Sequence, residues 1–113
     1  MIDADWVMAQ GDRLPDITAQ LAINGVPIDL TDATVTFLMI SINHAVQVEG
    51  YAEIVDAERG NVRYVWGEED TLAVGDYVAE WEITFDSGKK QTLPTKRPFT
   101  IHIRESLRSY RSD

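Results

Sequence analysis

The chain has no cysteine, few basic residues over most of its length and no long apolar run. Without cysteine it can form no disulfide, no thiolate zinc site and no cysteine nucleophile, and the redox compartment stays open. The densest apolar run, residues 37–40, is far too short to cross a bilayer. The N-terminus is acidic where a signal peptide needs a basic segment and a long apolar one. These absences predict a soluble chain without a membrane partner or an export signal.

Basic side chains are scarce over residues 1–82, which hold 16 acidic and 3 basic groups, a net charge of −13. Residues 83–113 hold 3 acidic and 7 basic groups, a net charge of +4, so the whole chain carries −9. So acidic a body argues against nucleic acid as the partner. The basic end fits an acidic partner surface or the acidic body of a second copy. A solvated face that keeps the protein soluble is the more common origin of such a pattern.

The length of 113 residues suits a single domain, and we find no repeat, low-complexity tract or linker that would divide it. We expect residues 1–104 to form this domain. Residues 105–113 then form a short basic C-terminal tail, and residues 104–111 are expected to be a short helix or an arm.

The clearest pattern lies in residues 75–92, where apolar and polar side chains alternate as in a strand with one buried face. The expected inward side chains are Tyr77, Ala79, Trp81, Ile83 and Phe85. Residues 86–88, Asp-Ser-Gly, then predict a tight reversal, and residues 89–93 a returning strand. A long hairpin of this kind is typical of an antiparallel sandwich.

Other segments repeat the alternation, with turn residues about every dozen positions. Residues 16–23 and 98–104 each have one apolar face, whereas residues 33–42 are apolar on both faces. A strand apolar on both faces is either central or covered by a partner. Tyr77, two residues after Gly75, matches the placement of a tyrosine corner, with a plain core tyrosine as the equal alternative. The fold class predicted is all-β, a single immunoglobulin-like antiparallel β-sandwich of seven to nine strands.

Catalytic signals are weak. His44 is expected in a loop tip and His102 on an outward face, and neither stands at metal-ligand spacing. The acidic run 68–70 lacks the ligand order of a calcium loop and is expected to form a solvated turn. Motifs for serine hydrolases, phosphate-binding loops and zinc proteases are missing. The sequence therefore predicts no enzyme, no cofactor and no metal site.

The tryptophans lie in acidic surroundings, which argues against a single-stranded nucleic-acid platform. Trp66 and Trp81 fall on predicted inward faces. Trp6 is expected to be partly exposed, either capping its own sheet or entering a partner's groove. The candidate partner-contact residues are Trp6, Met8, Arg104, Arg108, Tyr110 and Arg111.

Five segments occur in an order that is similar to a known family. They are residues 29–37 (DLTDATVTF), 60–66 (GNVRYVW), 75–85 (GDYVAEWEITF), 86–89 (DSGK) and 98–101 (PFTI). In order and spacing they resemble the N-terminal domain of phage baseplate upper proteins, over roughly residues 14–104. The resemblance implies a non-catalytic sandwich that docks onto the distal ring of a phage tail. Trimerisation through the helices that continue longer members is not expected to transfer to residues 1–113.

The leading hypothesis is therefore a virion structural protein of the tail or baseplate, made and assembled in the host cytoplasm. Its partners would be other tail or baseplate proteins, and a homo-oligomer is left open. The alternative is a carbohydrate- or cell-surface-binding sandwich, which exposed loop aromatics would favour. A hydrolase with a carboxylate pair that meets only in space is the remaining alternative, and no motif supports it.

Overall fold

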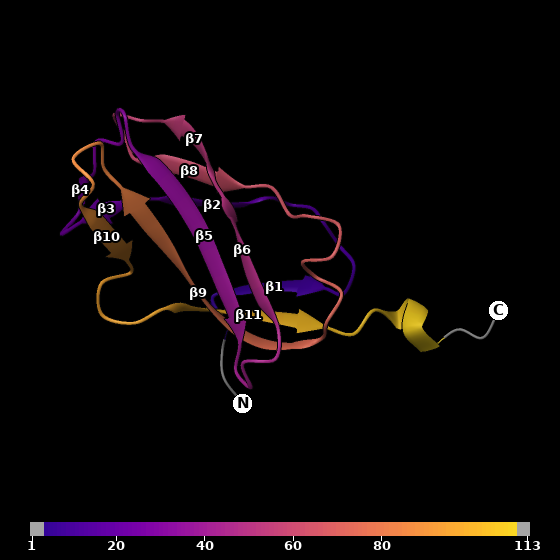
Figure 1. Ribbon diagram of the computed structural model, residues 1–113. Coiled ribbons are helices and arrows are strands. Elements are labelled where there is room, and N and C mark those ends of the chain that lie inside the picture. Colours follow the sequence, from indigo (N-terminus) through magenta and orange to yellow (C-terminus); the bar gives the residue numbers. More distant parts are fainter. Residues whose placement is uncertain (1–3, 111–113) are drawn as a thin grey trace.

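The computed structural model describes residues 4–110 and shows an all-β protein (Figure 1). Its larger sheet has the order β1-β11-β9-β5-β6, and β10 also pairs with β9. The strands of this sheet are β1 (Trp6–Ala9), β5 (Thr34–Ser41), β6 (Gln47–Tyr51), β9 (Gly75–Thr84), β10 (Lys90–Leu93) and β11 (Phe99–Arg104).

A second sheet has the order β2-β8-β7 and faces part of the larger one. Its strands are β2 (Ile17–Gln20), β7 (Glu53–Asp56) and β8 (Asn61–Tyr64). A separate hairpin of two-residue strands consists of β3 (Ala22–Ile23) and β4 (Val26–Pro27). A 3-10 turn, η1 (Leu107–Tyr110), follows the last strand. Among the described residues, no helix has the length and apolar character needed to span a membrane.

The long predicted hairpin is confirmed. Tyr77, Ala79, Trp81 and Ile83 are at most 3% exposed, because alternate side chains of β9 point into the sandwich. At the reversal the Gly88 N–H donates to the Phe85 carbonyl, and β10 returns antiparallel to the second half of β9. β11 pairs with the first half of β9, so β10 and β11 share one side of that strand.

The strand that is apolar on both faces was expected to be either central in its sheet or covered by a partner. It is central. β5 lies between β9 and β6, with Val35, Phe37 and Met39 buried on the inner side. Leu38 and Ile40 are half-buried on the outer side of the sheet.

Two details of the predicted fold are wrong. The sandwich is not wholly antiparallel, since β1 runs parallel to β11, with Trp6 beside Ile101 and Ala9 beside Arg104. Residues 4–110 also contain eleven strands and not seven to nine. One reason is that the predicted strand over residues 16–23 is divided at Leu21. Its N–H donates to the Gly60 carbonyl and its carbonyl accepts from the Ile28 N–H, so Leu21 belongs to neither β2 nor β3.

An aromatic cluster fills the space between the sheets. Phe37 stacks on Tyr64 with ring centroids 4.5 Å apart, and its edge contacts bring in Trp66 and Trp81. Trp66 and Trp81 are 0% and 3% exposed, which confirms that both face inward. The core therefore joins β5 and β9 of one sheet to β8 and the loop that follows it.

The Tyr77 hydroxyl donates a 2.6 Å hydrogen bond to the Ala73 carbonyl, four residues upstream. The side chain is buried, and burial raises the pKa of this phenol. Of the two interpretations of Tyr77, the bond to loop backbone is the one observed. It anchors the loop between β8 and β9 to the start of β9.

Candidate functional site

The described contact candidates lie on the neighbouring strands β1 and β11 and in the segment that follows β11. Trp6 and Met8 lie on β1, whereas Arg104 ends β11 and Arg108 lies in η1. The side chain of Tyr110 and all of Arg111 lie outside the described residues. Whether any of the six contacts a partner remains a prediction.

On β1 the side chains alternate between the interior and solvent. Val7 points outward and is 58% exposed, while Trp6 and Met8 point inward. Met8 is 6% exposed and belongs to the core, so we do not carry it forward as a surface residue. Trp6 packs against the core on one side. It is only half-buried because its other side lines a groove between the two sheets.

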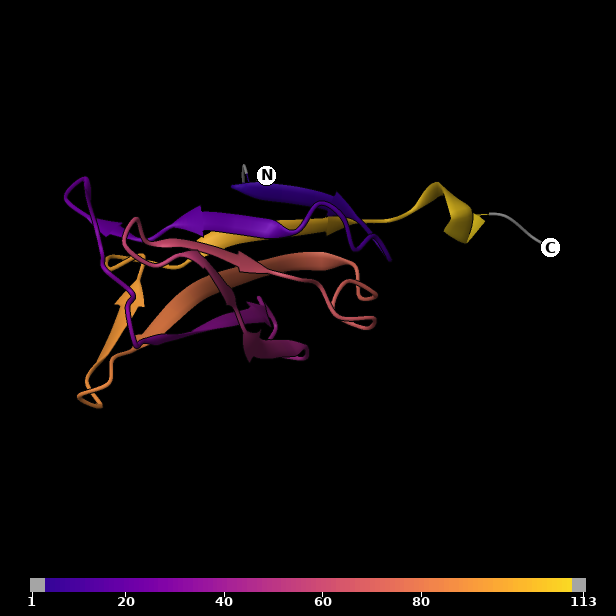
Figure 2. The same cartoon turned by 90° about the horizontal axis from the view of Figure 1, so that it is seen from above.

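The end of the chain projects from the body as an arm, which we define as residues 105–110 (Figures 1 and 2). Arg104 and Arg108 are exposed, and Leu107 is 78% exposed. The base of the arm is fixed, since the Arg104 carbonyl accepts a 2.8 Å hydrogen bond from the Gln10 N–H.

Residues 105–113 are not basic, contrary to the prediction. They hold two arginines, one glutamate and one aspartate, so the segment itself is neutral. The positive charge of the last third of the chain lies earlier. Its contributors are Lys89, Lys90, Lys96, Arg97 and Arg104.

A groove of about 460 Å³ opens between the two sheets beside Trp6. One wall is formed by consecutive residues 17–24, which include β2 and β3. The opposite wall is mainly apolar, and its members are Asp5, Trp6, Trp81, Leu93, Pro94, Thr95 and Phe99. The volume lies in the range of about 300–1,000 Å³ that is typical of ligand-binding clefts.

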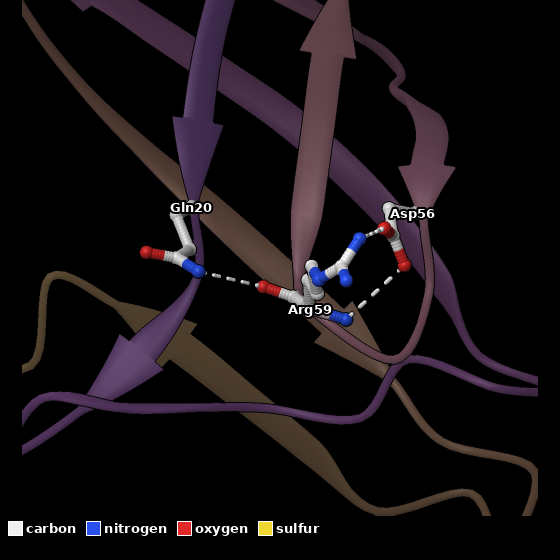
Figure 3. A network of polar contacts seen from close by, with 3 residues as sticks. All are labelled: Gln20, Asp56 and Arg59. Atoms are coloured by element: carbon white, nitrogen blue, oxygen red, sulfur yellow. Dashed lines mark hydrogen bonds and ion pairs between the residues drawn. The ribbon is translucent and has the colours of Figure 1, made fainter.

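Polar contacts hold both walls in place. Gln20, at the end of β2, donates a 3.0 Å bond from Nε2 to the Arg59 carbonyl (Figure 3). Arg59 in turn pairs with Asp56 at 3.0 Å, which ties β2 to the turn between β7 and β8. On the other wall, Asp5 Oδ2 accepts a 2.9 Å bond from the Thr100 N–H.

Two cations stand at one mouth of the groove. A second hollow, which shares Asp5, Pro94, Thr95 and Phe99 with the groove, is also lined by Lys96 and Arg97. Both cations are exposed, and neither forms an ion pair with a carboxylate of residues 4–110. This mouth is therefore lined by two cations and one carboxylate, that of Asp5.

The two histidines lie on β11 and in the turn between β5 and β6. His102 Nδ1 lies 2.7 Å from Asp76 Oδ1, but both side chains are about half exposed on the outer face of the larger sheet. His44 lies in the turn between β5 and β6. Within residues 4–110 no three His, Asp or Glu side chains gather in a way that could hold a metal ion.

The acidic run 68–70 forms a turn whose last carboxylate serves the fold. Asp70 Oδ2 accepts hydrogen bonds of 2.6 Å from the Tyr64 hydroxyl and from the Gly67 N–H. Burial raises the pKa of Tyr64 well above its usual range, and the bond to Asp70 raises it further. Asp70 thus closes the loop that covers the aromatic cluster.

A scan against protein-family models matches residues 3–111 to the BppU N-terminal domain, the N-terminal domain of phage baseplate upper proteins. This range includes both sheets, the groove and the base of the arm. The chain belongs to this family. The BppU N-terminal domain is a structural domain of the phage baseplate, so the family places the chain among virion tail proteins.

The other comparisons bear on the fold alone. A search of solved structures matches the crystal structure of CopC from Methylosinus trichosporium OB3b, with a TM-score of 0.55 and 14% sequence identity. The match covers 91% of this BppU N-terminal domain and 86% of that chain. No curated protein sequence matches. Nothing in these comparisons supports the alternative of a carbohydrate- or cell-surface-binding module.

Sequence reasoning found Trp6 but missed the groove of this BppU N-terminal domain. Alternation in residues 16–23 shows which side chains point inward, but not that β2 is an edge strand. Lys96 and Arg97 were counted only in the charge of the last third of the chain. Pro94 and Pro98 could have shown that these cations are exposed, because prolines on both sides of a short polar segment indicate a loop.

Proposed function

We propose that this protein is a non-catalytic baseplate module that joins other phage tail proteins by protein–protein contacts. The observation that carries the proposal is the family match over residues 3–111. Among the titratable groups described, Asp70 serves structural contacts with Tyr64 and Gly67, and the His102–Asp76 pair is about half exposed on the surface.

We propose the arm as one docking element, with Arg104 and Arg108 as its contact residues and Tyr110 and Arg111 continuing it. The support is its projection from the body and the 78% exposure of Leu107 (Figure 2). Its arginines would meet an acidic surface, either on another tail protein or on a second copy of this chain. In this proposal residues 1–104 are the folded body and residues 105–113 the tail.

We also propose an immunoglobulin-like class for the sandwich. The bond from the Tyr77 hydroxyl to the Ala73 carbonyl supports it, because such a corner is a hallmark of those domains. The parallel β1–β11 pair is then an addition at one edge of the larger sheet.

The docking role is tested by co-expression with the other tail proteins of the same phage, followed by affinity purification. A chain that ends at Ser106 keeps the bond between Gln10 and Arg104 and loses η1. We expect the intact chain to co-purify with at least one tail protein and the shortened chain to lose it. The double substitution Arg104→Glu and Arg108→Glu should have the same effect.

The control for the arm is Lys89→Glu, an exposed cation in the turn between β9 and β10, which should leave co-purification unchanged. Equal recovery of partners by the intact and shortened chains would remove the arm from the proposal. Failure of the intact chain to recover any tail protein would overturn the function itself.

A further inference from the structure

The wall of the groove formed by residues 17–24 has a feature that identifies what it can bind. Side chains of a strand alternate between two faces, so a cavity over one face is lined by every second residue. Here all four residues of β2, Ile17–Gln20, line the groove, together with residues 21–24 that follow them. A run without gaps arises when a cavity borders the backbone edge of a strand and not one of its faces.

The topology agrees, since β2 is the edge strand of its sheet and β8 is its partner on the other side. In an antiparallel pair, alternate residues direct their N–H and C=O groups away from the partner strand. Within residues 4–110 no strand pairs with that free side of β2. An unpaired edge of this kind is a template for an added strand.

From this edge we infer that the groove binds an extended peptide segment of a partner protein, which adds to β2 as a further strand. Backbone hydrogen bonds to β2 would supply affinity, and alternate side chains would point inward. The inward side chains would be apolar, because the facing wall presents Trp6, Trp81, Leu93 and Phe99. The free edge of β2 has four residues, so the added strand would pair with it over about 13 Å, at about 3.3 Å per residue.

Charge at the mouth specifies one end of that segment. Lys96 and Arg97 are exposed there without an ion pair to the described part of the chain, while Asp5 already accepts the bond from Thr100. A carboxylate on the incoming segment would therefore be favoured at this end, and a cation disfavoured. The ligand is thus an extended segment with alternating apolar residues and an acidic residue at one end.

The site lies between the sheets, apart from the arm at the end of β11, so it is a second docking element. It rests on the proposed function only for the origin of the segment, which would be another tail protein. Strand addition itself depends on the groove and its edge.

The test is a yeast-displayed library of random octapeptides, selected against the labelled intact chain. We expect enrichment of octapeptides that alternate apolar and polar residues and carry Asp or Glu at one end. For enriched peptides, amide hydrogen exchange within residues 17–20 should slow on binding, because free N–H groups of β2 become paired.

Two variants and one control test whether the selected peptides bind in the groove. Ala19→Phe places a ring in the groove and should weaken enriched peptides by at least about tenfold, a change that affinity measurements resolve easily. The matched control Ala45→Phe, at an exposed position in the turn between β5 and β6, should bind as the parent does. The double substitution Lys96→Glu and Arg97→Glu changes only exposed side chains, so it keeps the test decisive if Ala19→Phe does not fold. It should shift the preferred terminal residue from acidic to basic.

No enrichment, enriched sequences without alternation, or binding that Ala19→Phe leaves intact would overturn the inference. The proposed function would survive that result if the arm still recovers tail proteins. Conversely, enriched peptides on β2 together with no recovered tail protein would uphold the groove and overturn the baseplate role.

Discussion

At the scale of single residues, Gly60 shows how one position joins the two halves of the fold. Its φ is +70°, and a Cβ there would lie 2.4 Å from the Leu21 carbonyl oxygen and 3.0 Å from that of Ile28. The two backbones approach this closely because the Gly60 carbonyl accepts a 2.7 Å hydrogen bond from the Leu21 N–H. Only glycine combines this backbone conformation with this contact.

We expect Gly60→Ala to lower the free energy of unfolding by at least about 3 kcal/mol, from the left-handed conformation and from displacement of backbone. The matched control is Gly25→Ala, at φ +80° with no atom within 4 Å of the added Cβ. It should cost only about 1–2 kcal/mol, the conformational part alone. Urea unfolding of both variants measures the difference, and equal losses would contradict the role given to the contact with Leu21.

Tyr64 makes stability depend on alkaline pH. Its folded pKa is raised above the unfolded value of about 10, so the unfolded chain loses the phenol proton first. The contribution is therefore complete below about pH 10 and falls as pH rises above it. In Tyr64→Phe, unfolding free energy measured in urea should decline less steeply above about pH 10 than in the parent. Parallel declines would show that this phenol does not carry the dependence.

At the scale of elements, β5 organises the larger sheet because it is bonded on both sides and contributes the centre of the aromatic cluster. Neighbouring positions on this strand have opposite environments. Phe37 is 0% exposed and touches four other rings, whereas Leu38 is half-buried on the outer face.

Truncation to alanine at these two positions should separate the faces. We expect Phe37→Ala to cost about 3–5 kcal/mol, since it opens a cavity that the surrounding rings cannot fill. Leu38→Ala should cost less than about 2 kcal/mol, because it removes area that is only partly buried. Chemical denaturation gives both values. A larger loss at Leu38 than at Phe37 would mean that Leu38, and not Phe37, points into the core.

At the scale of the whole molecule, the body and the arm differ in how they are held. The molecule is elongated, with extents of 53 × 25 × 23 Å. Figures 1 and 2 show the arm directed away from the sheets. The arm is held at its base, where the Ser106 N–H donates to Gln10 Oε1, whereas Leu107 and Arg108 beyond it are exposed and remain available to a partner.

Deleting residues 107–113 should therefore change the free energy of unfolding by less than about 0.5 kcal/mol, as is usual for exposed positions. Urea unfolding of the shortened and intact chains tests this expectation. A loss above about 1 kcal/mol would show that the arm packs on the body, and a docking defect of the shortened chain would then reflect lost stability.

Local patterns in the sequence account for much of the fold. Alternation identified the buried face of β9 and both faces of β5, because side-chain direction in a strand depends only on position along it. Asp-Ser-Gly at residues 86–88 located the reversal, since its cause lies in the turn residues themselves. The family resemblance, carried by ordered core and turn segments, was confirmed over residues 3–111.

The sequence by itself determined the hairpin of residues 75–93, the buried faces of β9 and β5, and the family to which the chain belongs. Only the tertiary structure decided that β1 runs parallel to β11, that β2 is an edge strand, and that Trp6 and Lys96 border one groove. Trp6 and Ile101 are neighbours although they stand at opposite ends of the chain. Burial and turns follow from short-range chemistry, whereas edges and grooves depend on pairing between distant strands, which no local pattern records.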